Sequence, residues 1–345
     1  MTDAARRGVP ADDLVLGLDV GGTKLAAGVV AGDGRVLAMR VAPSRREEGP
    51  TPMIERLLGL GREAVEEAAA PWRRIRAVGI SCGGPLDPET GVILSPPNLP
   101  GWNGIPLGRI VSEALERPAV VDNDATAAAV AEWWFGAGRA GSVRDLVYLT
   151  ISTGIGGGLI LDGRPYRGAA GNAGELGHLT VDYLGRPCGC GRRGCLEAYA
   201  SGTNIAARAR EAIRTGKAST LEALDGFSAK EVAEAAAAGD ALAVRIWDET
   251  TAMLASGVAN ILDVFNPDLV VIGGGVARAG EQLLGPVRRG ALEQAMGPQA
   301  RAGRVVRAEL GEELPVVAAA VVAFERLPAD ATTPVVPAEG VAGRA

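Results

Sequence analysis

The chain has few residues that form crosslinks or bind metals, with one histidine and four cysteines among 345 residues. Three of the four cysteines are candidate metal ligands, as described below, which leaves too few for a disulfide framework and favours a reducing, cytoplasmic location. No run of eighteen apolar residues occurs, so no membrane span is expected. The first ten residues include arginines without an apolar run behind them, and we therefore expect no signal peptide.

Positive charge is also limited, since 35 Lys and Arg face 41 Asp and Glu, for a net charge of -6. A nucleic-acid surface needs a clustered basic face, so no nucleic-acid partner is expected. The length and a hydrophobic content of 47% predict two lobes of ordinary size. Residues 327–345 are rich in Pro, Ala, Thr and Gly, and we expect a disordered tail there.

The scarce metal-binding residues lie close together. The single histidine, His178, precedes Cys188, Cys190 and Cys195 within eighteen residues. One imidazole and three thiolates form the closed ligand set of a structural zinc site, and intervening glycines let a short loop fold back. Buried cysteines beside an unrelated histidine are the less favoured alternative at this density. The fourth cysteine, Cys82, is expected in the core.

Two similar segments, residues 14–30 and 146–161, each read as a strand, a glycine-containing turn and a second strand. This weak internal repeat predicts two related α/β lobes, whose turns could bind the phosphates of one nucleotide. Further strands are expected at 78–80 and 270–272, and helices at 54–70, 125–135, 205–212, 231–238, 242–262 and 316–324.

The first turn carries a carboxylate, two glycines, a hydroxyl and an ammonium group. Glycines let backbone N–H groups approach phosphate oxygens, and Asp19 could face a magnesium ion through water. An ordinary hairpin tip is equally compatible. A second turn is expected over 153–158, and the glycines at 273–275 could accept an adenine or ribose, or form a plain strand-to-helix turn. The candidate nucleotide-binding residues are Asp19, Gly21, Gly22, Thr23, Lys24, Thr153, Gly154, Gly156, Gly157, Gly274 and Gly275.

Asp122, Asn123 and Asp124 follow an apolar run and precede a helical pattern. A carboxylate at a strand end facing a cleft is a natural general base. The alternative is that Asp124 caps the helix. A helix N-terminus weakens a carboxylate as a base, but phosphoryl transfer depends more on positioning than on base strength.

Two glutamates flank the cysteine cluster, Glu175 three residues before the histidine and Glu197 two residues after the last cysteine. A metal site would fix both in space, where carboxylates can accept hydrogen bonds from sugar hydroxyls. Solvated loop glutamates are the alternative.

Together these motifs resemble the ROK family of sugar kinases and repressors, over roughly residues 14–324. The resemblance implies an α/β fold of two actin-like (ribonuclease H-like) lobes, with a nucleotide and sugar cleft between them. It implies lobes over residues 12–122 and 123–315, the first completed by the C-terminal helix near 316–325. Because the first hairpin starts at residue 14, a DNA-binding domain of the repressor type does not fit.

The resemblance further implies ATP-dependent phosphorylation of a hexose at the 6-hydroxyl, with Mg²⁺ and structural Zn²⁺. Residues 196–202 resemble the glucokinase branch, so glucose is the expected acceptor. N-acetylglucosamine, mannose or fructose as substrate, polyphosphate as donor, and a non-catalytic sugar sensor remain alternatives. A homodimer or homotetramer is expected by analogy. The implied roles are Asp124 as base, and Gly84, Asn98, Asn123, Asp124, Glu175, His178 and Glu197 as sugar-binding residues.

Overall fold

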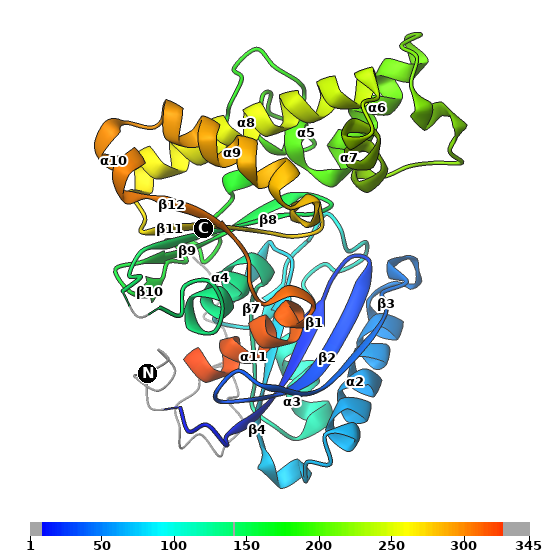
Figure 1. The fold of residues 1–345 in the computed structure, drawn as a ribbon. Coiled ribbons are helices and arrows are strands. Elements are labelled where there is room, and N and C mark those ends of the chain that lie inside the picture. The colour runs from blue at the N-terminus through cyan, green and yellow to red at the C-terminus, as the bar shows by residue number, and fades with distance from the viewer. Residues whose placement is uncertain (1–8, 141, 327–345) are drawn as a thin grey trace, which may run out of the picture. The chain divides into compact units, whose positions relative to one another are not determined.

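The computed structural model describes residues 9–140 and 142–326, which form two compact units (Figure 1). Unit 1 comprises the chain up to Ser142, then Pro165–Ala173, and the segment from Leu310 onwards. Unit 2 comprises Val143–Arg164 and Gly174–Glu309. The boundary expected between residues 122 and 123 lies within unit 1 in this division, and the expected tail at 327–345 lies outside the described residues.

Unit 1 is built on a five-stranded sheet in the order β3-β2-β1-β4-β7. The first three strands are antiparallel neighbours, whereas β4 and β7 extend the sheet in parallel with β1. The strand bounds are β1 Leu14–Val20, β2 Lys24–Ala31, β3 Val36–Pro43, β4 Ile75–Cys82 and β7 Ala119–Asn123.

Unit 2 contains a second sheet with the matching order β10-β9-β8-β11-β12. Here β8 and β9 form the antiparallel hairpin, and β11 and β12 continue the sheet in parallel. The predicted repeat of two hairpins is therefore confirmed. The bounds are β8 Leu146–Ile151, β9 Ile155–Leu161, β10 Arg164–Pro165, β11 Leu269–Gly273 and β12 Arg304–Arg307, and a separate small hairpin pairs β5 Leu86–Asp87 with β6 Val92–Ile93.

The alternation of β1 explains how helices cover both faces of the first sheet. Leu16 and Leu18 are fully buried and meet Gly61 of helix α2 (Pro50–Glu67). Gly17 points to the other face, where a Cβ would lie 2.3 Å from the carbonyl oxygen of Val316 in α11 (Leu314–Arg326). Because successive strand side chains point to opposite faces, this glycine lets α11 approach the sheet closely.

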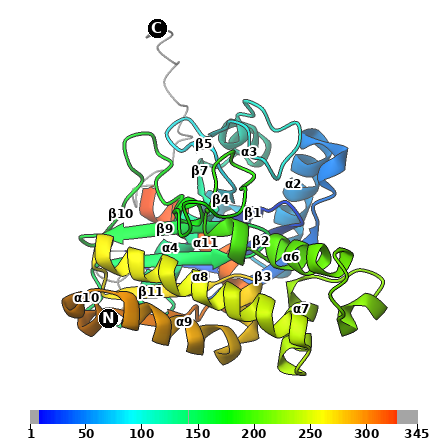
Figure 2. The same cartoon turned by 90° about the horizontal axis from the view of Figure 1, so that it is seen from above.

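The remaining helices pack in the same layered manner. In unit 2, α8 and α9 lie side by side along one face of the sheet (Figure 2). In unit 1, α4 packs against α11. The bounds are α3 Leu107–Leu115, α4 Asp124–Trp134, α5 Glu197–Ala200, α6 Gly202–Arg214, α7 Ala229–Ala237, α8 Ala241–Phe265, α9 Glu281–Gln294 and α10 Gly297–Ala302.

All six predicted helices are present, with shifted ends. The helix expected at 54–70 begins four residues earlier, because Pro50 suits the first helical position, which needs no N–H donor. It ends before Ala69, whose φ of 49° is left-handed. Over the described residues, no helix is long and apolar enough to cross a membrane.

Candidate functional site

The first glycine turn (residues 21–23) joins β1 to β2 in unit 1. Gly21 N–H donates to the carbonyl of Lys24 at 3.1 Å, which closes the turn. Ser44, which is buried, donates from its backbone to the Thr23 carbonyl and from Oγ to the Gly22 carbonyl, both at 2.9 Å. The Gly22 and Thr23 carbonyls therefore accept hydrogen bonds from the protein. Within the described chain, the N–H groups of the same two residues donate to no backbone carbonyl or side chain. Free successive N–H groups in a turn are suited to a phosphate.

Asp19 lies on β1, and one strand, β4, separates it from β7, which leads into Asp124. Ser81 Oγ donates to Asp19 Oδ1 at 2.7 Å from the neighbouring strand β4. Burial, opposed by the Ser81 hydrogen bond and assisted by the charge of Asp124, raises the pKa of Asp19 to about 7. Burial, followed by the charges of Asp124 and Asp19, raises the pKa of Cys82. The side chain of Cys82 is completely buried, which confirms its predicted place in the core.

Asn123 is the last residue of β7, and Asp124 is the first residue of α4. The cap predicted as an alternative role for Asp124 belongs to Asn123, whose Oδ1 accepts from Ala125 N–H at 3.0 Å and Thr126 N–H at 3.1 Å. Asn123 has the extended backbone of a cap residue, because β7 ends on it. Asp124 is the first helical residue and is exposed. Its carboxylate is thereby presented at the end of a parallel strand.

The two other predicted sugar-binding residues of unit 1 lie next to these groups. A Cβ at Gly84 would lie 3.2 Å from Asn123 Nδ2, so any larger residue would crowd that amide. Asn98 lies against the first glycine turn, because a Cβ on Gly22 would be 3.2 Å from the Asn98 carbonyl oxygen. Unit 1 thus brings together the predicted phosphate turn, the Asn98 loop and the Asn123–Asp124 strand end.

The second glycine turn (residues 152–154) joins β8 to β9 in unit 2. We predicted a turn extending to Gly158, but it ends at Gly154, because β9 pairs with β8 from Ile155 onwards. Gly156 and Gly157 are strand residues, and Gly157 is buried, with its Cα facing Gly174 and Leu176. Of the predicted glycines here, Gly154 is therefore the one within the turn, next to Thr153.

Glu197 contacts this turn directly, which the sequence did not indicate. Its Oε2 accepts the Ile155 N–H at 2.8 Å, and a Cβ on Gly154 would approach it to 2.7 Å. The N-terminus of α6 adds a second contact, from Gly202 N–H to the Ser152 carbonyl at 2.7 Å. The carboxylate predicted to bind sugar is thus also an anchor of the second glycine turn.

The two glycines that follow β11 differ in their surroundings. Gly274 has a φ of 87°, and a Cβ there would lie 2.5 Å from the Ile151 carbonyl oxygen, so the chain requires glycine. Gly275 has open space around it, with the nearest atom, Ser152 Oγ, 4.0 Å from a Cβ position. The backbone at Gly275 is therefore open to approach by another molecule.

The four predicted metal ligands converge in unit 2. Their ligand atoms all lie within 4.8 Å of one another, with Cys188 Sγ 3.7 Å from His178 Nδ1 and Cys190 Sγ 3.7 Å from Cys195 Sγ. The cysteine loop (residues 187–195) reaches this shape through left-handed glycines at 191 and 194. The donor set and its closeness fit a tetrahedral zinc ion.

The surroundings of the cluster act differently on its thiols, since burial raises the pKa of Cys188 and of Cys195. The backbone N–H of Arg192 lowers the pKa of Cys190, and the Arg192 guanidinium donates to the His178 carbonyl at 2.7 Å. His178 turns Nδ1 toward the cluster and Nε2 toward Glu175, whose Oε2 lies 3.9 Å away. Glu175 is otherwise exposed, with 64% of its side chain accessible. A metal bound to Nδ1 would thus fix the ring so that Nε2 points toward Glu175.

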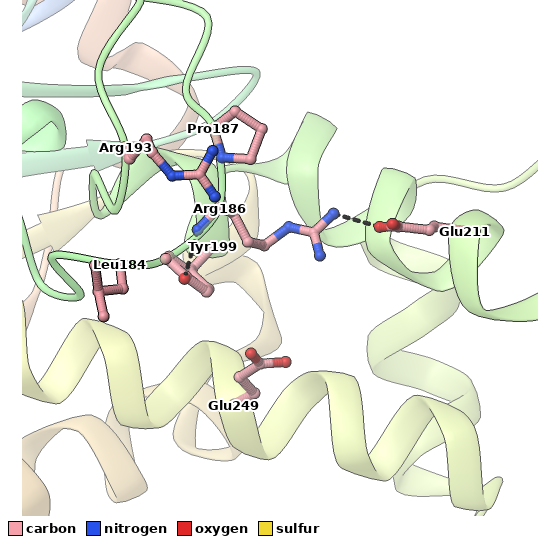
Figure 3. Close-up of a pocket in the computed structure, with 8 residues that line it drawn as sticks. Leu184, Arg186, Pro187, Arg193, Tyr199, Glu211 and Glu249 are labelled. Carbon is pink, nitrogen blue, oxygen red and sulfur yellow. Dashed lines mark hydrogen bonds and ion pairs between the residues drawn. The ribbon is translucent and has the colours of Figure 1, made fainter.

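A pocket of about 410 Å³ lies beside the cysteine loop but contains none of the predicted site residues (Figure 3). Arg186 crosses it to pair with Glu211 of α6, and its backbone N–H donates to the Tyr199 hydroxyl at 2.9 Å. These contacts secure the cysteine loop to α5 and α6. The lining residues are Leu184, Gly185, Arg186, Pro187, Arg193, Tyr199, Glu211 and Glu249.

Comparison with known proteins supplies the family. The model of the ROK family matches residues 15–326. The glucokinase of Thermotoga maritima is 36% identical over 317 residues, covering 91% of this chain and 98% of the relative. Among solved structures, the ROK hexokinase of Thermus thermophilus is 39% identical, covers 90% of this chain and 98% of that one, and has a TM-score of 0.75.

A second solved structure, the ROK family glucokinase of Streptomyces griseus in complex with glucose and AMPPNP, is 34% identical. The match covers 90% of this chain and 99% of the Streptomyces griseus chain, with a TM-score of 0.78. These likenesses confirm the predicted α/β fold with two actin-like lobes. The chain belongs to the ROK family.

Proposed function

We propose that this protein is a glucokinase that transfers the γ-phosphoryl group of ATP to the 6-hydroxyl of glucose. Relatives named glucokinase cover most of the chain, and one related glucokinase was solved with glucose and the ATP analogue AMPPNP. The observation that carries the proposal here is the exposed carboxylate of Asp124, at the end of β7 and close enough to Asp19 to raise its pKa.

In this proposal Asp124 accepts the proton of the attacking hydroxyl. Phosphoryl transfer passes through a loose transition state, so the main demand on this residue is orientation. The Asn123 cap and the first turn of α4 provide that orientation, since they fix the backbone on both sides of the carboxylate. The free N–H groups of Gly22 and Thr23, with Lys24 beside them, would bind phosphate oxygens.

Asp19 would hold Mg²⁺, which neutralises charge on the phosphates when bound. The cluster of His178, Cys188, Cys190 and Cys195 would hold structural Zn²⁺. His178 Nε2 and Glu175 Oε2 would then form a fixed pair of groups for sugar hydroxyls. Glu197 would contribute a further carboxylate while holding the second glycine turn.

The test is ADP release in a coupled assay with a hexose panel and with ATP or polyphosphate as donor. Glucose with ATP should give the highest kcat/KM, and Asp124→Asn should reduce kcat by about 100-fold or more. Asp240→Asn is a matched control, because Asp240 caps α8 and asparagine preserves that cap. Sugar binding without turnover of any sugar would instead identify a sensor.

A further inference from the structure

Asp122, which precedes the Asn123–Asp124 pair, is buried and forms an ion pair with Arg167, 45 residues further along the chain. Its side chain is 2% exposed, and its Oδ2 accepts from Arg167 Nε at 2.9 Å and Nη2 at 2.6 Å. Its other oxygen, Oδ1, accepts the backbone N–H of Asn123 at 2.8 Å. The carboxylate therefore links the Arg167 guanidinium to the main chain of Asn123.

Arg167 is itself held from a second side. Its Nη2 also donates to Glu325 Oε2 of α11 at 2.8 Å. The two carboxylates raise the pKa of Arg167, although partial burial acts against them. A buried carboxylate left without its cation is strongly unfavourable, so this arrangement tolerates little displacement.

We propose that Arg167 is a positioning residue for phosphoryl transfer, acting through Asp122 to set the orientation of Asn123 and Asp124. This inference rests on the proposed function, since it concerns the same strand end. The Asn123 backbone determines both where its Oδ1 meets the N-terminus of α4 and where its Nδ2 lies beside Gly84. A rotation of the Asn123 peptide would displace the sugar-binding amide and the Asp124 carboxylate together.

The expected effect is large because transfer depends on geometry. A displacement of about 1 Å at a reacting group can reduce turnover by about 100-fold. The nucleotide turns are attached to other strands, so the loss should appear in kcat and in the KM for glucose, and leave the KM for ATP unchanged.

The chain offers a matched control in Arg326. Its Nη1 donates to the Val121 carbonyl at 3.0 Å, on the same strand β7, and to the Pro88 carbonyl at 2.6 Å. It also pairs with Glu89. Arg326 thus supports β7 through main-chain carbonyls and, within the described residues, makes no hydrogen bond or ion pair with Asp122. Its loss should therefore affect stability without turning the Asn123 peptide.

The experiment compares Arg167→Gln, Arg167→Lys and Arg326→Gln in the full chain. For each, kcat, the KM for glucose and the KM for ATP are measured well below the melting temperature, and glucose affinity is measured by calorimetry. Arg167→Gln should reduce kcat by about tenfold to 100-fold and weaken glucose binding. Arg167→Lys, which keeps the charge but has a single ammonium, should recover part of the loss.

Two results would overturn the inference. One is an Arg167→Gln protein that melts earlier but keeps the kcat and glucose affinity of the wild type. The other is an equal loss of kcat in Arg326→Gln. If Arg167→Gln does not fold, Arg167→Lys decides between the same outcomes. Wild-type turnover of glucose tests the proposed function separately, and calorimetry still compares the variants if the wild type proves inactive.

Discussion

Ser81 Oγ and Asp19 Oδ1 form a 2.7 Å hydrogen bond between adjacent parallel strands, in register at the ends of β4 and β1. The bond leaves Oδ2 of Asp19 to face other partners, and it opposes the rise in the pKa of Asp19 that burial causes. Ser81 therefore keeps available a carboxylate that burial would otherwise protonate.

Removing this donor should weaken metal binding. We expect Ser81→Ala to raise the pKa of Asp19 above about 7. The affinity for Mg²⁺ with ATP should then fall by about fivefold near neutral pH, the effect of a rise of roughly one pKa unit on the deprotonated fraction. The measurement is the Mg²⁺ dependence of turnover. Ser112→Ala is the control, because Ser112 Oγ donates to the Arg117 carbonyl away from the site. Equal Mg²⁺ dependence in both variants would show that Ser81 does not act through Asp19.

Mg²⁺ affinity of the wild type should itself depend on pH. The pKa of Asp19 is raised to about 7, and a carboxylate binds Mg²⁺ in its deprotonated form. The binding-competent fraction therefore increases with pH, and the apparent affinity at pH 8 should exceed that at pH 6 by about tenfold. Titration of Mg²⁺ at fixed ATP, corrected for the protonation of ATP, measures this. Asp19→Asn should abolish the dependence, and a wild-type affinity independent of pH would contradict it.

Substitutions of Glu197 should distinguish its hydrogen bond to the second glycine turn from its proposed contact with glucose. Glu197→Gln retains an oxygen for the Ile155 N–H, so the second glycine turn and the KM for ATP should be preserved. The KM for glucose should rise by about tenfold, because hydrogen bonds to a charged group are worth roughly 1.5–3 kcal/mol. Glu197→Ala should also raise the KM for ATP and lower the melting temperature. Wild-type glucose kinetics in Glu197→Gln would assign this residue to the turn alone.

Gly274 and Gly275 form a matched pair for testing the glycines after β11. Gly274→Ala should destabilise the fold by about 1–3 kcal/mol, because it combines a left-handed φ with a close contact to the Ile151 carbonyl. Gly275→Ala should fold normally, since its Cβ meets open space, and should raise the KM for ATP if a nucleotide lies on this backbone. Melting temperature and ATP kinetics are the two readouts. Unchanged ATP kinetics in Gly275→Ala would remove Gly275 from the nucleotide site.

Metal analysis should find about one zinc per chain, the content of a four-ligand structural site. Cys195→Ser should lose the metal and weaken glucose binding, because His178 and Glu175 then lose their fixed arrangement. Cys82→Ala is the control, since Cys82 lies in the core outside the cluster. Zinc retained in Cys195→Ser, or absent from wild-type protein purified without chelator, would refute the site.

The sequence predicted best where a local pattern determines the structure. Both hairpins and all six helices follow from apolar spacing and glycine turns within short windows. The convergence of His178 with the three cysteines follows from their spacing and from glycines that permit a tight loop. In these cases the interactions that form the structure join residues near in sequence.

Contacts between distant residues were not predictable in this way. Arg167 is 45 residues from Asp122 and 158 from Glu325, and no pattern in the sequence marks either pairing. The contact of Glu197 with the second glycine turn spans 42 residues and was missed for the same reason. The helix cap is a different kind of error. Asp and Asn are both good N-cap residues, and Asn123 takes this role because β7 ends on it.

The position of Glu325 near the C-terminal end of the described chain has a consequence for when the site can form during synthesis on the ribosome. Arg167 is synthesised midway through the chain, but Glu325, its second carboxylate, emerges only when α11 has been made. Helix α11 also covers the glycines on the face of the first sheet. The strand end that carries Asn123 and Asp124 therefore obtains its full support only when translation is almost complete, so a nascent chain stalled before residue 314 would have every proposed catalytic group and still lack a competent site.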